Sequence, residues 1–361
     1  MNVNVSTSLE VLGRSAQFQR IVEVLAQDGD LLITGVPGCG RRTLGRQAAL
    51  EIGAKALEVD CIRATEGRRF VELLADAISQ NFEPALMQTW VNTTGNEFFV
   101  LESEKNTSKL KLLRLDPKQL WQAFVQLIQL PQLLAEAADT RVVLILHSFP
   151  HIRAWDRNHE WEDTLRREIK WQTRVSYVLI ATIAESINQT EAQNPITAIE
   201  LAPLSDEVLA VWAREILHTQ QLTFDSRSPA VEIFVRAVQG HIGDAMALIR
   251  RLVALRRSDG VIREQQVQQA IQELLQDLSI TFESLLMLLP ASQVQLLESL
   301  ALDPTDKPQS KQYIEKHRLA RGGSLQGALS GLQHKGLIYG DEHHYRLALP
   351  LFALWLRQRL N

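Results

Sequence analysis

The chain has 361 residues, which is enough for two or three domains, and its formal net charge at pH 7 is −4. This near balance of charge excludes a protein that binds nucleic acid over its whole surface. The chain has a polar N-terminus, no apolar run that approaches the length of a membrane span, and two cysteines, Cys39 and Cys61. We therefore expect a reduced cytoplasmic protein without a membrane partner.

The first predicted unit is the segment 29–44, GDLLITGVPGCGRRTL. Its apolar run at 31–34 predicts a short strand, and the apolar residues beyond the glycines recur at helical spacing. A strand, a glycine-rich turn and a helix in this order are typical of a phosphate-binding loop. Glycines let backbone N–H groups curl around phosphate oxygens, and the helix N-terminus adds its dipole. The glycines of this loop are Gly35, Gly38 and Gly40.

The loop departs from the G-x-x-x-x-G-K-[ST] pattern at its two reactive positions. Arg41 stands where a lysine would bind the phosphates, and a planar guanidinium does not fit as a compact ammonium does. Arg42 stands where a hydroxyl would ligate Mg²⁺, which an arginine cannot do, and Thr43 comes one residue late. We predict that the loop architecture is retained and that its catalytic half is altered. The candidate nucleotide contacts are Gly35, Gly38, Cys39, Gly40, Arg41, Arg42 and Thr43.

Four further strand-like runs alternate with helical patterns, as in a parallel α/β sheet that is covered on both faces. They are ALEV from Ala56, VVLIL from Val142, YVLIAT from Tyr177 and AIEL from Ala198. The predicted first domain, 1–201, is therefore α/β with a five-stranded parallel sheet. In the usual strand order of such a sheet the two cysteines lie on well-separated strands, and Cys39 fills space in the loop.

The segment at about 82–118 interrupts this alternation. The runs EFFVLES and KLKLLRLD flank the polar stretch EKNT, which predicts an inserted β-hairpin. Such an insertion serves either as an arm that docks a partner or as a decoration of the fold.

Strand patterns stop after Leu201. Residues 202–278 carry helical patterns that begin at a capping-type Ser-Asp pair, so we predict an all-helical lid domain. Residues 279–361 predict three short helices and then a hairpin whose turn contains Gly340 and Asp341. Three helices and a β-wing make a winged helix-turn-helix domain.

The winged helix is mildly basic. Residues 291–361 contain nine Lys/Arg and six Asp/Glu, a net charge of +3 in a chain that is acidic as a whole. The candidate recognition helix, 324–334, exposes Ser and Gln side chains that can read base edges, but it contains no Lys or Arg. Docking of a protein is the open alternative. The candidate DNA contacts are Arg321, Lys335 and Arg346 for phosphates, and Gln326 and Ser330 for bases.

The order of these segments resembles the AAA+ ATPases of the origin-recognition and archaeal-initiator type, and the related signal-transduction ATPases with numerous domains, along nearly the whole chain. The resembling segments are VLGRSAQFQRI, GVPGCGRRTL, VVLILHSF, ATIAES, GDAMAL and HHYRLALPLFALWLRQR. In this order, the resemblance implies an adenine-side box with Arg14, the Walker A loop, the Walker B strand, sensor 1, the sensor 2 helix, and the wing with its last helix. Gln17 stands where the adenine-side box usually has Glu.

The chain departs from this family at most positions that would act on the γ-phosphate or on the metal. His147 and Ser148 stand where Walker B would supply Asp and Glu, and Met246 stands at the sensor 2 arginine. Thr182 remains at sensor 1. Since phosphoryl transfer depends on positioning and electrostatics, these losses remove most of what the protein would contribute. We expect no catalytic residue, no Mg²⁺ or other metal site, and a binding of ATP or ADP that is weak or lost.

The leading hypothesis is a pseudo-ATPase that acts as a DNA-associated or protein-interaction regulatory subunit, with a protein partner or as a homo-oligomer. A second hypothesis is a slow ATP-hydrolysing switch that takes Arg166, Arg167 or Arg174 from a neighbouring protomer as an arginine finger. A third is a winged-helix DNA-binding regulator whose P-loop domain only oligomerises. ATP turnover separates the second hypothesis from the first, and DNA binding separates the third.

Overall fold

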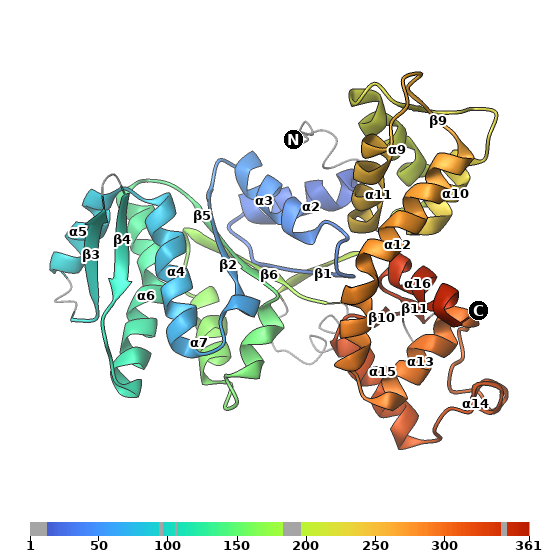
Figure 1. Ribbon diagram of the computed structural model, residues 1–361. Coiled ribbons are helices and arrows are strands. Elements are labelled where there is room, and N and C mark those ends of the chain that lie inside the picture. The colour runs from blue at the N-terminus through green and yellow to red at the C-terminus, as the bar shows by residue number, and fades with distance from the viewer. Residues whose placement is uncertain (1–12, 94–96, 105–106, 183–195, 341–344, 361) are drawn as a thin grey trace.

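The computed structural model of this protein describes residues 13–93, 97–104, 107–182, 196–340 and 345–360 (Figure 1). A five-stranded sheet forms its first half, with the strand order β2-β5-β6-β1-β7 and every neighbouring pair parallel. The strands are β1 (Leu31–Gly35), β2 (Lys55–Asp60), β5 (Val142–His147), β6 (Val175–Ile180) and β7 (Thr197–Leu201). The predicted five-stranded parallel α/β sheet is confirmed.

Apolar side chains of the sheet point alternately to its two faces, and helices cover both. In β5, Val142 and Leu144 pack into one core, and Val143 and Ile145 pack into the other. One face carries α2 (Ser15–Ala26) and α3 (Arg41–Glu51), and the other carries α4 (Gly67–Asn81), α6 (Pro117–Ala137) and α7 (Glu160–Ile169) (Figure 1). Because both faces are covered, β1, β5 and β6 are buried along their full length and read as continuous apolar runs.

The inserted segment contains the predicted hairpin. β3 (Phe99–Glu104) and β4 (Thr107–Leu112) are antiparallel, with Phe99 opposite Leu112. Both side chains are buried in the core formed with α4 and α6, so the hairpin packs against the body of the domain. A helix, α5 (Pro84–Thr93), precedes the hairpin and is not predicted by the sequence pattern. Only two of its residues are buried, so it lacks a strong apolar periodicity.

The lid begins after β7. Its helices are α9 (Asp206–Thr219), α10 (Ala230–Val238), α11 (Ile242–Ala254) and α12 (Glu264–Met287). β8 (Thr223–Phe224) and β9 (Val261–Ile262) form a parallel pair within it, so the prediction of an all-helical lid was wrong in this detail. Two-residue strands are too short to show a period in the sequence.

The winged helix has the predicted three helices and hairpin, followed by a final helix. Its elements are α13 (Ala291–Leu302), α14 (Lys311–His317), α15 (Gly323–His334), β10 (Ile338–Tyr339), β11 (Arg346–Leu347) and α16 (Pro350–Leu360). β10 and β11 are antiparallel. Asp341 of the predicted turn lies outside the described residues, as does the part of the ATIAES segment after Thr182.

The lid and the winged helix share one hydrophobic core. α12 crosses the border predicted at 278, and the ring centroid of its Phe282 lies 5.1 Å from that of Phe352 and 5.7 Å from that of Trp355 in α16. The division into 202–278 and 279–361 therefore stays a prediction, because one helix contributes to both units.

The two cysteines, Cys39 and Cys61, are buried and free. They follow β1 and β2, which β5 and β6 separate in the sheet. Within the described ranges, we find no helix with the length and apolarity needed to cross a membrane.

Candidate functional site

A cleft of about 670 Å³ lies at the edge of the sheet where β1, β5 and β6 end. The carboxyl ends of parallel strands meet at one edge, so the cleft gathers segments that are far apart in the sequence. The glycine loop and the start of α3 line it together with Ser148 after β5, Thr182 after β6 and Met246 of α11. These are the Walker A, Walker B, sensor 1 and sensor 2 positions of the predicted family. One further lining residue, Lys335, comes from the winged helix.

The backbone of the loop requires glycine at three positions. Gly35, Gly38 and Gly40 have φ angles of 153°, 80° and 96°. A Cβ on Gly35 would lie 2.7 Å from the carbonyl oxygen of Leu201. Gly40 is the N-cap of α3 and offers no side chain to the first N–H groups of that helix. Uncapped N–H groups beside a cleft are the usual basis of an anion site.

Arg41, at the position of the P-loop lysine, is tied to the sheet. Its guanidinium donates a hydrogen bond to the carbonyl oxygen of Ala181, directly after β6. Burial lowers the pKa of Arg41, although the arginine stays charged at any physiological pH. The side chain links α3 to the end of β6, and Arg41 is one of the residues that line the cleft.

An ion pair occupies the corner where a P-loop enzyme would hold its metal. Arg42 Nη2 lies 2.9 Å from Asp60 Oδ2, so a guanidinium replaces the hydroxyl ligand and binds the carboxylate next to it. Behind this pair, Glu58 Oε1 lies 2.7 Å from Arg46 Nε, and Glu58 Oε2 lies 2.8 Å from His147 Nε2. His147, the last residue of β5, is therefore a partner of Glu58. In the described part of the chain, no group of three or more His, Cys, Asp or Glu residues could hold a metal ion.

The sequence pattern did not indicate the carboxylates of Glu58 and Asp60 as site residues. Glu58 lies in the predicted strand run ALEV and Asp60 directly follows it, and nothing in that run indicates which strand lies next to it. The register with β5 places Asp60 opposite His147. The hydrogen bond from His147, together with Arg46, lowers the pKa of Glu58 despite its partial burial. Both carboxylates are thus paired with basic side chains.

His241 of the lid contacts the glycine loop, and the sequence pattern did not indicate it as a site residue. Its Nδ1 caps α11 by accepting a hydrogen bond from the backbone N–H of Asp244 at 2.9 Å, and its Nε2 contacts the carbonyl oxygen of Pro37. The N–H of Gly243 donates to the carbonyl oxygen of Gly38 at 3.0 Å. Burial alone would lower the pKa of His241, but the contacts with Asp244 and Pro37 raise it. The only hint in the sequence is its place just before GDAMAL.

The winged helix also packs against the loop. A Cβ on Gly336, directly after α15, would lie 3.1 Å from Thr182 Cγ2 and 3.4 Å from Pro37 Cγ. Asp244 of the lid accepts a hydrogen bond from the backbone N–H of Leu351 at 2.9 Å. The loop, the lid and the winged helix therefore meet at Pro37 and Gly38.

The remaining predicted nucleotide contacts lie around the cleft but do not line it. Burial raises the pKa of the Cys39 thiol, so Cys39 is a neutral filler beside Gly35. The guanidinium of Arg14 donates to the carbonyl oxygen of Ala202, where the sheet passes into the lid. Arg14 thus joins two domains rather than lining the described cleft.

The five candidate DNA contacts do not form one uniform surface. Exposed ion pairs hold Arg321 to Glu315 at 3.3 Å and Arg346 to Asp306 at 3.2 Å. Gln326 Oε1 accepts from Gln309 at 2.5 Å, and Ser330 Oγ lies 3.4 Å from His334 Nδ1. Lys335, directly after α15, also borders the glycine-loop cleft.

The three arginines considered as fingers have partners within the chain. Arg166 and Arg153 both bind Glu162 at 2.7 Å, and these bonds outweigh burial and hold the pKa of Glu162 at about 2. Arg174 pairs with Asp139 at 3.3 Å, and Arg167 donates to a threonine of its own helix. None of the three lines the described cleft.

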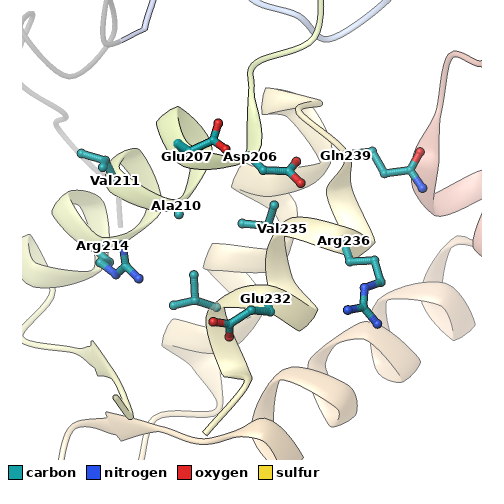
Figure 2. A pocket seen from close by; sticks show the side chains of 10 residues that line it. Asp206, Glu207, Ala210, Val211, Arg214, Glu232, Val235, Arg236 and Gln239 are labelled. Carbon is teal, nitrogen blue, oxygen red and sulfur yellow. The ribbon is translucent and has the colours of Figure 1, made fainter. Parts of the chain in front are cut away.

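A second large groove lies between α9 and α10 of the lid (Figure 2). Its volume is about 820 Å³, and its rim carries charges of both signs, with Asp206, Glu207 and Glu232 beside Arg214 and Arg236. It shares no residue with the glycine-loop cleft. Its lining includes no glycine and mixes acidic with basic side chains, so we do not assign the nucleotide site to this groove.

Comparisons with known proteins bear on the fold. A family model described as a probable winged helix domain matches residues 280–358. No curated protein matches the chain. The solved Walker-type ATPase PABY2304 of Pyrococcus abyssi is 14% identical, with 95% of each chain covered and a TM-score of 0.65. The ORC1 protein of Aeropyrum pernix, solved in complex with DNA, is 16% identical, with 96% of this chain and 94% of that chain covered and a TM-score of 0.50.

At these identities the likeness concerns the fold alone. The chain has the fold of AAA+ ATPases of the origin-recognition and archaeal-ATPase type, with a C-terminal winged helix, as the resemblance in the sequence implied.

Proposed function

We propose that this protein is a degenerate AAA+ protein that does not hydrolyse ATP and acts as a regulatory subunit through its winged helix. The observation that carries this proposal is the Arg42–Asp60 ion pair at 2.9 Å, in the corner where a metal would bridge the protein and the phosphates. Asp60 is neutralised there by a guanidinium, which has no lone pair to offer a metal.

The other groups that phosphoryl transfer needs support the same conclusion. Efficient transfer requires a metal to neutralise developing charge and a residue to orient the attacking group. Ser148 borders the cleft at the position of the catalytic carboxylate, and Met246 borders it at the position of the sensor arginine. Of the Walker B, sensor 1 and sensor 2 positions, only sensor 1, Thr182, keeps a residue that is typical of the family. The cleft therefore favours weak binding of ATP or ADP in which Mg²⁺ plays no part.

ATP turnover tests the loss of catalysis. We expect the purified chain to release phosphate from ATP no faster than a variant that lacks the loop, with or without Mg²⁺. Calorimetry with ADP should give the same weak affinity in Mg²⁺ as in a chelator. Steady multiple turnover that Arg41→Ala reduces would contradict the proposal and support the slow ATPase.

The second candidate function is binding of DNA by the winged helix, and the AAA+ fold of the A. pernix protein solved with DNA favours it. Arg321 and Arg346 are exposed and only weakly held by surface ion pairs, so both can turn to phosphates. Arg321→Glu in the full chain should weaken duplex binding at low salt and flatten its salt dependence by about one unit of slope. If this variant shifts duplex as the wild type does, the winged helix docks a protein or a further copy of the chain instead.

A further inference from the structure

Four large apolar side chains are exposed far more than the others in the described part of the chain. Trp171 directly follows α7 and is 76% exposed, and Ile280, Met287 and Leu288 at the C-terminal end of α12 are 75%, 85% and 80% exposed. The next highest exposed fraction among the large apolar side chains of these ranges is 56%. Scattered exposed apolar residues are ordinary, whereas a cluster of them marks a contact surface.

The turn that carries Trp171 is fixed to the body of the first domain. The side chain of Gln172 donates to a backbone carbonyl of α6 at 2.9 Å. The N–H groups of Thr173 and Arg174 both donate to Gln132 Oε1 of the same helix, at 3.1 and 2.8 Å. A tryptophan on a fixed backbone loses little conformational entropy on binding, which favours it as the anchor of an interface.

The three exposed residues of α12 form one stripe, which we call the α12 stripe. Ile280 and Met287 are two helical turns apart and Leu288 follows, so they share a face that lies opposite the buried Phe282 and Leu286. Phe282 packs on α16, whereas the α12 stripe is left to solvent.

The charges around the two surfaces are opposite. Residues 166–174 contain four Lys/Arg and one Glu, and Lys170 and Arg174 on either side of the tryptophan are exposed. Residues 264–306 contain seven Asp/Glu and no Lys or Arg, and Glu283 within the span of the α12 stripe is exposed. The ion pair that Arg174 makes within the chain is itself exposed, so its exchange for another acidic partner costs little.

We propose that copies of this protein associate head to tail, with Trp171 of one copy seated on the α12 stripe of the next. The indole covers the apolar side chains, and the basic residues beside it face the acidic surface around Glu283. α7 belongs to the first domain and α12 to the C-terminal half (Figure 1), and both surfaces are exposed, so they cover each other between two copies. A pairing of two α12 stripes would instead set acidic surfaces against each other.

The contact is heterologous, because the two surfaces differ. Each added copy brings one further surface of each kind, so association continues to a ring or a filament and does not stop at a dimer. Neither surface lines the glycine-loop cleft, so this contact is independent of nucleotide binding and of ATP turnover.

Sedimentation of the full chain at low salt, at concentrations up to about 1 mM, tests this contact and covers weak association. The wild type should form species larger than a dimer, and its association should weaken as the salt concentration rises. Trp171→Ala and Met287→Asp should each weaken association about thirtyfold, because each removes an anchor of the interface. Leu50→Ala is the matched control, because Leu50 is an exposed leucine of α3 outside both surfaces. Circular dichroism checks that each variant is folded.

A mixture of the two variants tests the head-to-tail order. Trp171→Ala keeps an intact α12 stripe and Met287→Asp keeps an intact tryptophan, so the mixture should give a two-chain species that neither variant gives alone. A mixture without this species, or a monomeric wild type, would overturn the proposal. Association of Trp171→Ala at the strength of the wild type would show that two α12 stripes pair, and an equal loss in Leu50→Ala would show unspecific contact. Both results would overturn it too, whereas ATP turnover bears only on the proposed function.

Discussion

At the scale of single residues, the ion pair of Arg42 is the feature of the cleft that bears most on its chemistry. The guanidinium of Arg42 lies beside Asp60, with side-chain exposures of 53% and 24%. An ion pair this exposed contributes about 0–1 kcal/mol to stability, so it does not account for the fold. Its consequence is chemical, because a guanidinium cannot ligate a metal and here it is bound to the neighbouring carboxylate. The structure thus places a salt bridge beside the glycine loop, at the position where the P-loop pattern has a hydroxyl.

Asp30, at the start of β1, supports a prediction on pH. Its Oδ1 accepts a hydrogen bond from the backbone N–H of Tyr177 at 2.8 Å, and burial raises its pKa to about 6 from the usual 3.8. Above pH 6 the folded protein carries this costly buried charge, and below about pH 4 the carboxyl is protonated in both the folded and the unfolded state. The contribution of Asp30 to stability is therefore lost as the pH rises from about 4 to 6.

We expect Asp30→Asn to keep the acceptor and remove the charge. Its melting temperature should exceed that of the wild type at pH 8, and the difference should vanish near pH 4. Thermal melts across this range check it, with Asp139→Asn as the control, because the Asp139 side chain is 91% exposed. A difference that stays constant with pH would show that Asp30 is not the titrating group.

At the scale of elements, α12 is the feature that joins the C-terminal half. It is a 24-residue helix, and it carries buried residues such as Leu274 into the lid core and Phe282 into the packing against α16. The border predicted from the sequence, at 278, falls within this helix. Since apolar contacts run along the whole helix, the lid and the winged helix are expected to unfold together.

Two fragments test this coupling. A fragment of residues 202–361 should melt in one cooperative transition, because it keeps the shared core intact. A fragment of residues 279–361 loses the first half of α12 and exposes the face that the lid covers, so it should melt at a clearly lower temperature. Circular dichroism at 222 nm measures both. Equal melting temperatures would mean that the winged helix is an independent domain.

At the scale of the whole molecule, three domains converge on the glycine loop. Pro37 and Gly38 contact His241 of the lid, and Pro37 also contacts Gly336 of the winged helix. Asp244 of the lid accepts a hydrogen bond from the backbone N–H of Leu351, which links the lid to the winged helix. The glycine loop is therefore the place where the sheet, the lid and the winged helix meet.

Gly38→Ala should separate the lid from the loop. A Cβ at this position would lie 2.5 Å from the His241 ring, and the φ of 80° adds backbone strain of about 1–2 kcal/mol. Gly53→Ala is the matched control, because Gly53 has a φ of 69° but no atom within 4 Å of a Cβ. We expect Gly38→Ala to lower the melting temperature more than the control and to speed hydrogen exchange at 241–246. Equal effects of the two variants would show that the lid contact contributes nothing.

The sequence by itself determined the sheet, the glycine loop, the inserted hairpin and the winged helix. These features depend on local patterns: apolar runs for buried strands, glycines where φ is positive, and short helices followed by a hairpin. The sequence also shows where the chain departs from the motifs of the AAA+ ATPases, because each motif has a fixed spacing. These departures are Arg41, Arg42, His147 and Met246. Helix α5 was not predicted because its apolar periodicity is weak, and the pair β8–β9 was not predicted because its strands have two residues each.

Only the tertiary structure decided which side chains meet. Arg42 and Asp60 are neighbours because α3 and β2 pack together at one edge of the sheet, and Asp60 lies opposite His147 because β2 pairs with β5. His241 and Pro37 are 204 positions apart and touch because the lid folds back on the loop. Lys335 borders the cleft for the same kind of reason. No periodicity encodes these contacts, since they depend on strand order and on how domains pack, which are properties of the whole chain.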